Sequence, residues 1–394
     1  MKFLFFSYLD WYAGSERMLP ILMNHLAQEK ENEIVFVCNS DAEYVKNITE
    51  LLDKKIEIIP LKLFHIDFKK RKDELIFFRL ILNLISYLKF IVLKYYFVIL
   101  NRNKISKAID LREYDTVHIN NGGYPGSFAA IGFVLFCYSL KFNKLFFVVN
   151  NLAVSRKHPL RMFDRPLDFL VKNRVTSFVT ASNFAGERLK SVLQTPKVRT
   201  IPNAVVLDSK SLGHNHVNNN LVVGMIGILE KRKGHALAIS AMKKVVAIIP
   251  NAVLLIEGEG ELRDSLQQLI EDLGLHEHVR LMGREENIWS FYARLDILIF
   301  TSVDNEDMPN VISESQGLGI PVVSHKIAGT IEQVIHDNTG YLVDIGDEEK
   351  LVNYIQLLND EKRRRDFGKN ARKNYLLNFS PEVSINNYIK LYNY

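Results

Sequence analysis

The fold is decided by residues 297–323, which read ILIFTSVDNEDMPNVISESQGLGIPVV. An apolar run ends at Phe300, a polar loop follows, and Pro309 and Asn310 open a helix before a second apolar run at Val322. Strand, helix and strand in this order are typical of a parallel sheet with helices on its faces. The stretch therefore predicts a doubly wound α/β fold.

Two glutamates of this stretch are candidate binding residues. Glu306 lies in the loop at the carboxyl end of the first strand, and Glu314 lies about one turn inside the helix. The helix N-terminus offers free N–H groups and the positive end of a dipole. Two carboxylates beside it can accept hydrogen bonds from vicinal hydroxyls. The pattern is compatible with a site for a sugar or a phosphate and, taken alone, also with a solvated loop.

The same alternation recurs along the chain and indicates two domains. The strand-like runs are 2–7, 33–38, 116–119, 145–149, 177–180, 221–226, 253–257, 279–282, 297–300 and 322–324. A polar, turn-forming run interrupts them, so we expect a Rossmann-like domain over 1–206, a linker over 207–220 and a second Rossmann-like domain over 221–378. Such domains bind ligands at the carboxyl ends of their strands, here across an expected interdomain cleft. A last helix over 379–394 is expected to return to the first domain.

Composition places limits on the partners. The chain has 394 residues, a net charge of +5 and a pI of about 8.9. This balance fits phosphorylated ligands or an anionic surface, and it is too weak to indicate nucleic acid. Only Cys38 and Cys137 are present, both in apolar runs, so a reducing cytoplasm is the expected compartment. The apolar Met1–Leu9 fits a first buried strand better than a signal peptide.

An apolar segment, Leu75–Leu100, stands out in the first domain. Its sequence LIFFRLILNLISYLKFIVLKYYFVIL is interrupted by Arg79, Lys89 and Lys94. Cations at the centre of a spanning helix are costly, at about 2.5–3.5 kcal/mol each, so the segment is not expected to cross a bilayer. Two interpretations stay open: an aromatic, basic amphipathic helix on a membrane surface, or a core helix of the domain.

The 297–323 stretch resembles the Glu-x7-Glu motif of the GT4 (group 1) family of retaining glycosyltransferases, which have the GT-B fold. The residues that match the family pattern are Glu306, Pro309, Glu314, Gly319, Pro321, Val322 and Val323. Asp307 departs from it, since the family has glycine there. The resemblance implies two facing Rossmann-like domains, with Glu306 at the hydroxyls of the donor sugar and Glu314 at the ribose.

A second segment, residues 222–235 (VVGMIGILEKRKGH), is similar to the part of the family that neutralises the donor diphosphate. Lys233 matches the family lysine, whereas Ile228 stands where the family has arginine. Lys231 or Arg232 could substitute for that arginine, and spacing does not choose between them. The donor-binding residues implied by resemblance are Gly14, Ser15, Gly258, Gly260, Gly283, Arg284, Pro309, Asn310, Val311 and Glu314.

The first domain offers a Gly-rich loop after the predicted strand 116–119. Asn120 and Asn150 stand where many family members carry histidine. Asparagine can bind a substrate but cannot act as a base near neutral pH. Asn120 is therefore grouped with Glu306 and Lys233 as a catalytic candidate, without the role of proton acceptor. His118 should point the other way on a regular strand, which favours a structural role.

The resemblance implies an enzyme that moves a hexose-type sugar from a UDP- or GDP-sugar to a lipid-linked saccharide in O-antigen or capsule synthesis. We expect it in the cytoplasm, peripheral on the inner face of the plasma membrane, with no cofactor and no obligatory metal. The basic residues Arg156, Lys157, Arg161 and Arg165 either meet lipid phosphates or form a solvated face. The alternatives are an epimerase or phosphorylase of the same fold, and a non-catalytic membrane-associated scaffold subunit.

Overall fold

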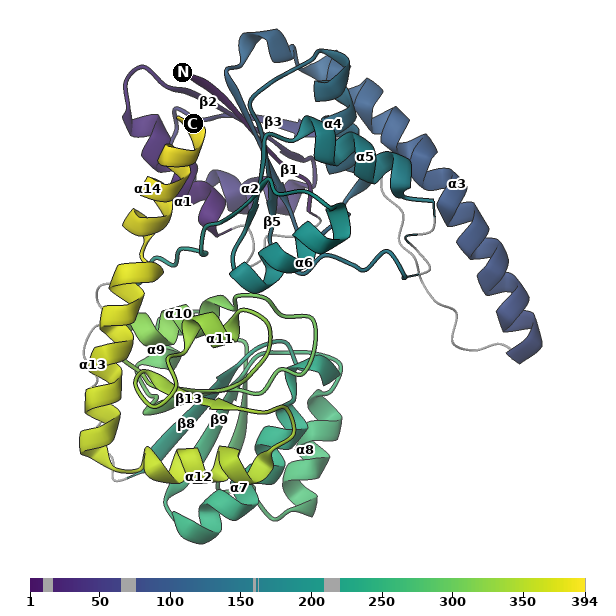
Figure 1. Cartoon of the computed structure of the whole chain (residues 1–394). Helices are drawn as coiled ribbons and strands as arrows, with labels where there is room; N and C mark the ends of the chain where they lie inside the picture. The colour runs from purple at the N-terminus through teal and green to yellow at the C-terminus, as the bar shows by residue number, and fades with distance from the viewer. Residues whose placement is uncertain (10–16, 65–75, 159–160, 162, 209–219, 394) are drawn as a thin grey trace. The chain divides into compact units, whose positions relative to one another are not determined.

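The computed structural model describes residues 1–9, 17–64, 76–158, 161, 163–208 and 220–393, with side chains from Lys89 onward in the long helix α3. It divides into two compact units, each described here by itself (Figure 1). Unit 1 comprises Met1–Ile201 and Asn387–Tyr394, and unit 2 comprises Pro202–Asn386. Most of the predicted linker, residues 209–219, lies outside the described residues.

Unit 1 contains a parallel sheet in the order β3-β2-β1-β4-β5-β6-β7. Its strands are β1 (Lys2–Ser7), β2 (Glu33–Asn39), β3 (Glu57–Leu61), β4 (Thr116–Asn121), β5 (Leu145–Val149), β6 (Ser177–Thr180) and β7 (Val198–Thr200). The central strands are buried on both faces, because helices cover the two sides of a parallel sheet. The strand order reverses between β1 and β4, which makes the carboxyl ends of these two strands the switch point of the sheet.

The helices of unit 1 include one that is much longer than the rest. They are α1 (Met18–Gln28), α2 (Ala42–Thr49), α3 (Ile76–Ala108), α4 (Phe128–Ser139), α5 (Arg165–Arg174) and α6 (Asn183–Leu193). Figure 1 shows α3 running beside α4 at its C-terminal end. Gly132 of α4 permits this close approach, since a Cβ there would lie 2.9 Å from the Val98 carbonyl oxygen of α3.

The described part of α3 has one buried and one exposed face, so the core-helix interpretation holds for its buried face, and the membrane-surface interpretation stays a prediction. Ile91, Val98 and Ile105 are buried in the core of the unit. Val92 and Tyr96 on the other face are 69% and 54% exposed. No helix of the described residues has both the length and the apolarity needed to cross a membrane.

Unit 2 repeats the architecture with a parallel sheet in the order β10-β9-β8-β11-β12-β13. Its strands are β8 (Leu221–Ile226), β9 (Ala252–Glu257), β10 (Val279–Gly283), β11 (Ile297–Phe300), β12 (Val322–His325) and β13 (Gly340–Val343). The helices beside them are α7 (His235–Ile248), α8 (Arg263–Asp272), α9 (Ile288–Tyr292), α10 (Asn310–Gly317) and α11 (Thr330–Gln333). Separate apolar clusters surround the sheet, and its order reverses between β8 and β11. The predicted two-domain α/β class is confirmed.

The chain ends in three helices, α12 (Glu348–Leu357), α13 (Glu361–Asn378) and α14 (Pro381–Tyr392). The first turn of α14 contacts unit 2, where Ser384 Oγ donates to the Pro202 carbonyl oxygen at 2.6 Å. From Asn387 onward the chain packs in unit 1. Residues 202–206, placed in the first domain by the sequence, contact unit 2 instead; Tyr375 Oη donates to the Val205 carbonyl oxygen at 2.6 Å.

Candidate functional site

The strand order of unit 2 locates its candidate site. β8 and β11 are neighbours at the point where the order reverses, and the loops that follow them begin at Gly227 and Thr301. Ligands of open α/β sheets bind at the carboxyl ends of strands at such a switch point. The predicted residues Lys233 and Glu306 lie in these two loops, so the topology brings together residues that are 73 positions apart in the chain.

The two loops are joined through their backbones. Val303 N–H donates to the Arg232 carbonyl oxygen at 2.8 Å, and Thr301 Oγ1 donates to the Gly234 carbonyl oxygen at 3.1 Å. Gly234 has a φ of 75°, and a Cβ there would lie 2.1 Å from the Thr301 carbonyl oxygen. Only glycine meets both demands. The short 3-10 turn Lys231–Lys233 is therefore held firmly against the loop that carries Glu306.

Two cations converge on one carboxylate oxygen at this junction. Oε1 of Glu306 accepts from Lys233 Nζ and from Arg232 Nη1. Arg232 Nη2 also pairs with Glu230 at 2.6 Å. The side chains of Glu306, Lys233 and Arg232 are 11%, 14% and 30% exposed, so the charges are shielded but reachable. Such an arrangement can bind a phosphate through its cations and a hydroxyl through its carboxylate.

The structure distinguishes the two neighbours that could stand in for the family arginine. Ile228 is 58% exposed and brings no charge. Lys231 is exposed at the start of the turn, whereas Arg232 reaches Glu306 beside Lys233. Spacing alone could not distinguish these residues, because the direction of each side chain depends on the 3-10 turn.

The helix α10 begins at Asn310, with Pro309 as its N-cap and no side-chain cap. Glu314 is 2% exposed and accepts a hydrogen bond of 2.6 Å from Tyr292 Oη. The same hydroxyl lies 3.3 Å from the Val311 carbonyl oxygen. Glu314 is thus fixed inside the first turns of the helix, below the end that carries Pro309, Asn310 and Val311.

The predicted glycines after β9 have a structural use in the described chain. Gly258 has a φ of 137°, and a Cβ on it would lie 2.1 Å from the Gly227 carbonyl oxygen. A Cβ on Gly260 would lie 2.5 Å from the Leu229 carbonyl oxygen. Both glycines therefore let the loop after β9 pack backbone against backbone on the loop after β8. Gly283 also has a positive φ, of 76°, and Arg284 beside it is exposed.

Two buried polar residues near these loops were missed by the sequence reasoning. Glu257 ends β9 and is 8% exposed; burial raises the pKa of its carboxyl group, and one oxygen accepts from Glu285 N–H at 3.3 Å. His325 ends β12, where burial lowers its pKa and Nδ1 lies 3.1 Å from the Ser302 carbonyl oxygen. A polar residue at the last position of an apolar strand was the available signal for both.

In unit 1 the predicted Gly14 and Ser15 lie outside the described residues. Asn120 ends β4 at the switch point and is 4% exposed. Its Oδ1 accepts from Asn150 Nδ2 at 2.7 Å, and Asn150 also donates to the Asn121 carbonyl oxygen at 3.2 Å. The two asparagines at the family's histidine positions are thus bonded to each other, as a pair of amides that can bind a ligand but cannot titrate.

His118 is a structural residue in this geometry. It is 2% exposed, and its Nδ1 lies 2.6 Å from Tyr392 Oη of the C-terminal helix. Burial lowers the pKa of His118 to about 3, so the imidazole is neutral at physiological pH. His118 therefore helps to hold the end of α14 on the sheet of unit 1.

A metal site was not expected, and the Asp304–Glu306 run is the one place where a metal clamp could be imagined from the sequence. Within the described ranges, no group of three or more histidine, cysteine, aspartate or glutamate side chains is arranged to hold a metal ion. The carboxylate of Glu306 is instead bonded to two cations.

Comparison with known proteins supports the class that the fold and site define. Residues 209–374 match the family Glycosyl transferases group 1. The capsular polysaccharide biosynthesis glycosyltransferase CapM of Staphylococcus aureus is 30% identical over 184 residues, which cover 46% of this chain and 48% of CapM. The N-acetylgalactosamine-N,N'-diacetylbacillosaminyl-diphospho-undecaprenol 4-alpha-N-acetylgalactosaminyltransferase of Campylobacter jejuni is 34% identical over 37% of this chain and 40% of its own length.

Among solved structures, Anabaena HepE in complex with UDP has a TM-score of 0.74 at 19% identity, over 99% of this chain and 98% of that chain. This likeness shows the fold, which is GT-B. Residues 209–374, a little less than half of the chain, match the group 1 glycosyltransferases. The sequence matches span about half the length, or less, of the curated relatives. The predicted fold is confirmed, and the match over residues 209–374 supports the predicted family and transferase class.

Proposed function

We propose that the protein is a retaining glycosyltransferase that moves a hexose-type sugar from a UDP- or GDP-sugar to a lipid-linked saccharide, in the synthesis of a bacterial surface polysaccharide such as O-antigen or capsule. One observation carries the proposal. Lys233, Arg232 and Glu306 meet at the carboxyl ends of neighbouring strands, at the switch point of the sheet in unit 2.

The charges at this point suit a nucleoside diphosphate that leaves during the reaction. Lys233 and Arg232 stabilise the negative charge that develops on the diphosphate, since fixed cations need no reorganisation as the bond breaks. A diphosphate that takes these cations releases the Glu306 carboxylate from them. Glu306 is then available to accept hydrogen bonds from the hydroxyls of the donor sugar, while Glu314 does the same for the ribose.

The buried amides of unit 1 suit an acceptor rather than a proton relay. Asn120 and Asn150 can orient a hydroxyl by hydrogen bonds but cannot remove its proton near neutral pH. The proposal therefore assigns the acceptor proton to the departing phosphate of the donor, on the face from which that phosphate leaves. Attack on this face retains the configuration of the transferred sugar.

The acceptor and the location are supported by the relatives and by α3. The name of the Campylobacter relative specifies a diphospho-undecaprenol acceptor, and that of the Staphylococcus relative specifies capsular polysaccharide. The exposed apolar face of α3, with Val92 and Tyr96, supports work at the inner face of the plasma membrane by a peripheral, cytoplasmic enzyme. We propose that no cofactor and no metal is required, which a chelator that lowers the rate tenfold would contradict.

The test measures transfer of the sugar from the nucleotide to a lipid acceptor. Purified protein is mixed with UDP- and GDP-sugars labelled in the sugar, together with a membrane lipid extract, and the label in the organic phase is counted. NMR of the product then reads the anomeric configuration. Labelled lipid whose new bond has the donor's configuration supports the proposal. Free sugar phosphate or an epimerised nucleotide sugar indicates one of the other GT-B chemistries, and an inverted bond refutes the retaining mechanism.

A further inference from the structure

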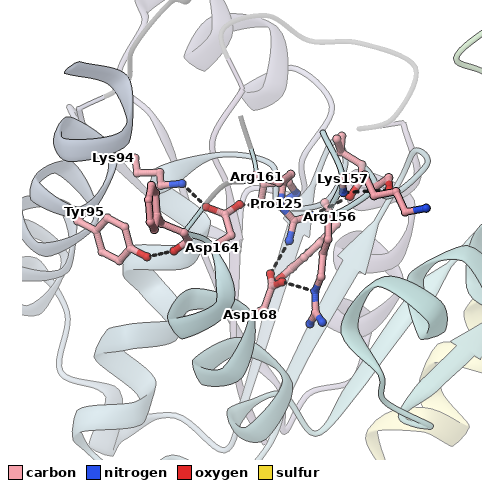
Figure 2. A network of polar contacts seen from close by, with 12 residues as sticks. Lys94, Tyr95, Pro125, Arg156, Lys157, Arg161, Asp164 and Asp168 are labelled. Carbon is pink, nitrogen blue, oxygen red and sulfur yellow. Dashed lines mark hydrogen bonds and ion pairs between the residues drawn. The ribbon is translucent and has the colours of Figure 1, made fainter. Parts of the chain in front are cut away.

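A second charged site lies in unit 1, between α3 and the start of α5. It contains the charge cluster Lys94, Arg156, Arg161, Asp164 and Asp168 (Figure 2). Arg161 occupies its centre with 1% of its side chain exposed. Its guanidinium pairs with Asp164 and with Asp168, each at 2.6 Å, and donates to the Val154 carbonyl oxygen at 2.8 Å.

The charge cluster has one more cation than carboxylates. Lys94 of α3 pairs with Asp164, and Arg156 pairs with Asp168 at 3.0 Å. Asp168 also accepts from Tyr124 Oη at 2.8 Å, so both aspartates are fully engaged by donors. The aspartates, Lys94 and Arg161 are at most 5% exposed. Buried charges are costly unless paired, and the surplus positive charge here is left for an anion.

A pocket of about 830 Å³ opens beside the charge cluster. Its polar wall contains Arg156, Arg161 and Arg165. Arg165 is exposed and has no acidic partner among the residues that the structure describes. Three guanidinium groups against the single carboxylate of Asp168 give the pocket a net positive lining. Guanidinium groups are well suited to phosphate oxygens.

The pocket lining also has an apolar part, which we call the apolar wall. It contains Ile91 and Val92 of α3 together with Phe163 and Pro166, and Val92 is 69% exposed. Phe163 is 61% exposed and has a φ of 67°, a rare conformation for a bulky residue, and Tyr95 Oη bonds its carbonyl oxygen. An exposed phenylalanine held in a strained conformation at a pocket rim points to a ligand that covers it. The stripe of exposed side chains continues along α3 through Tyr96 and Ile99.

We propose that this pocket binds the phosphate head of the prenyl-phosphate lipid that carries the acceptor saccharide, with Arg165 on the phosphate and Phe163 and Val92 against the first part of the lipid chain. The inference rests on the proposed function for the identity of the lipid. The combination of cations and an exposed apolar wall fits a phosphorylated amphiphile. A free phosphate would leave the apolar wall uncovered, and a phospholipid surface alone would not need a pocket.

The test measures binding of an undecaprenyl phosphate, carried in phosphatidylcholine nanodiscs, to the whole protein. Arg165→Gln is compared with Lys157→Gln, which removes the same charge from an exposed neighbour outside the pocket lining. Phe163→Ser is compared with Phe169→Ser, since Phe169 is 64% exposed but does not line the pocket. We expect Arg165→Gln to weaken binding at least about fivefold, the effect of one cation at an anionic lipid. Phe163→Ser should weaken it by at least about the same factor, because an apolar surface that the lipid covers is lost. Each control should change it less than about twofold.

Three results would overturn the proposal: equal losses in the pocket variants and their controls, equal affinity for nanodiscs of the same charge made with phosphatidylglycerol, or displacement of the lipid by inorganic phosphate at the lipid's own concentration. Titration of UDP and GDP into all four variants distinguishes failure of the lipid pocket from failure of the proposed function. Unchanged nucleotide binding with lost lipid binding supports the pocket. Lipid binding at the pocket without sugar transfer to any lipid-linked acceptor would leave the pocket standing and reject the transferase.

Discussion

Replacing Glu306 by glutamine removes a negative charge from the proposed donor site and keeps the side-chain shape. Oε1 of Glu306 accepts from Lys233 and Arg232, and the glutamate side chain is 11% exposed. The substitution therefore leaves both cations without this partner. Arg232 keeps its pair with Glu230 at 2.6 Å, so most of the unpaired charge falls on Lys233.

We expect Glu306→Gln to lower the free energy of unfolding and, at the same time, to tighten nucleotide binding. Breaking a fully buried pair costs about 3–5 kcal/mol, and an exposed pair is worth about 0.2–1 kcal/mol. With Arg232 30% and Lys233 14% exposed, we expect a loss of about 1–2 kcal/mol in the free energy of unfolding. A carboxylate about 4 Å from a phosphate repels it by at least about 1 kcal/mol. Glu306→Gln should therefore bind UDP or GDP about fivefold more tightly.

The assay is calorimetric titration of UDP and GDP into the wild type, Glu306→Gln and the control Glu348→Gln. Glu348 pairs with Lys244 at 2.9 Å between α12 and α7, so the control removes an ion pair of unit 2 away from the candidate site. We expect tighter nucleotide binding only in Glu306→Gln. Sugar transfer by this variant should fall at least about 100-fold, since it loses a group that binds the transition state.

Weaker nucleotide binding in Glu306→Gln, by about tenfold or more, would refute the reasoning, because it would mean that Lys233 and Arg232 do not receive the diphosphate. The same conclusion would follow if Glu306→Gln and Glu348→Gln changed nucleotide binding equally.

Three further predictions concern single residues. Arg232→Gln should weaken UDP or GDP binding about tenfold, because Arg232 reaches Glu306. Lys231→Gln, on the exposed side of the same turn, should change the affinity less than about twofold. Equal losses in the two variants would show that only the total charge of the turn matters. Ala328 has a φ of 43°, a conformation that costs non-glycine residues about 1–2 kcal/mol. After the larger entropy of glycine in the unfolded chain is deducted, Ala328→Gly should raise the free energy of unfolding by about 0.5–1 kcal/mol. A lower thermal midpoint of unfolding in this variant would contradict the prediction. Burial lowers the pKa of His118 to about 3 in the folded protein, whereas a histidine in the unfolded chain has a pKa near 6.5. As the pH falls, the unfolded chain therefore takes up the proton first. The contribution of His118 to the free energy of unfolding is fully present above about pH 6.5 and is lost progressively below it, by about 2 kcal/mol at pH 5. Urea titrations at pH 7 and pH 5 should show a smaller difference for His118→Gln, which can still bond Tyr392, and an unchanged difference would exclude His118 as the cause.

The central strands could be predicted because they are buried on both faces and therefore appear as continuous apolar runs. β3 and β7 were missed for the opposite reason. Glu57 and Pro60 of β3 are exposed, and β7 has only three residues. The length of α3 was also underestimated, since its apolar run ends at Leu100. The helix continues to Ala108 because Asn101 and Ile105 face inward.

Only those residues of the candidate site that lie in recognisable motifs could be predicted from the sequence. Lys233 and Glu306 were identified by their positions in two motifs, and the strand order explains why the two residues meet. The choice between Lys231 and Arg232 depends on the geometry of a single 3-10 turn, which local sequence does not determine. The partner of His118 is Tyr392, 274 residues away, and no pattern in either segment connects them. The charge cluster in unit 1 likewise joins residues of α3 and α5 whose basic and acidic character alone suggests a solvated face.

The most direct test of the central claim is acceptor-dependent release of nucleotide from UDP- and GDP-sugars, recorded for the wild type beside Glu306→Gln with a membrane lipid extract as acceptor. We expect release of nucleotide from one donor, which depends on the extract and is lost in Glu306→Gln. If a defined lipid-linked saccharide also gives no release from any donor while UDP or GDP still binds, the protein is not a transferase, and the scaffold interpretation takes its place.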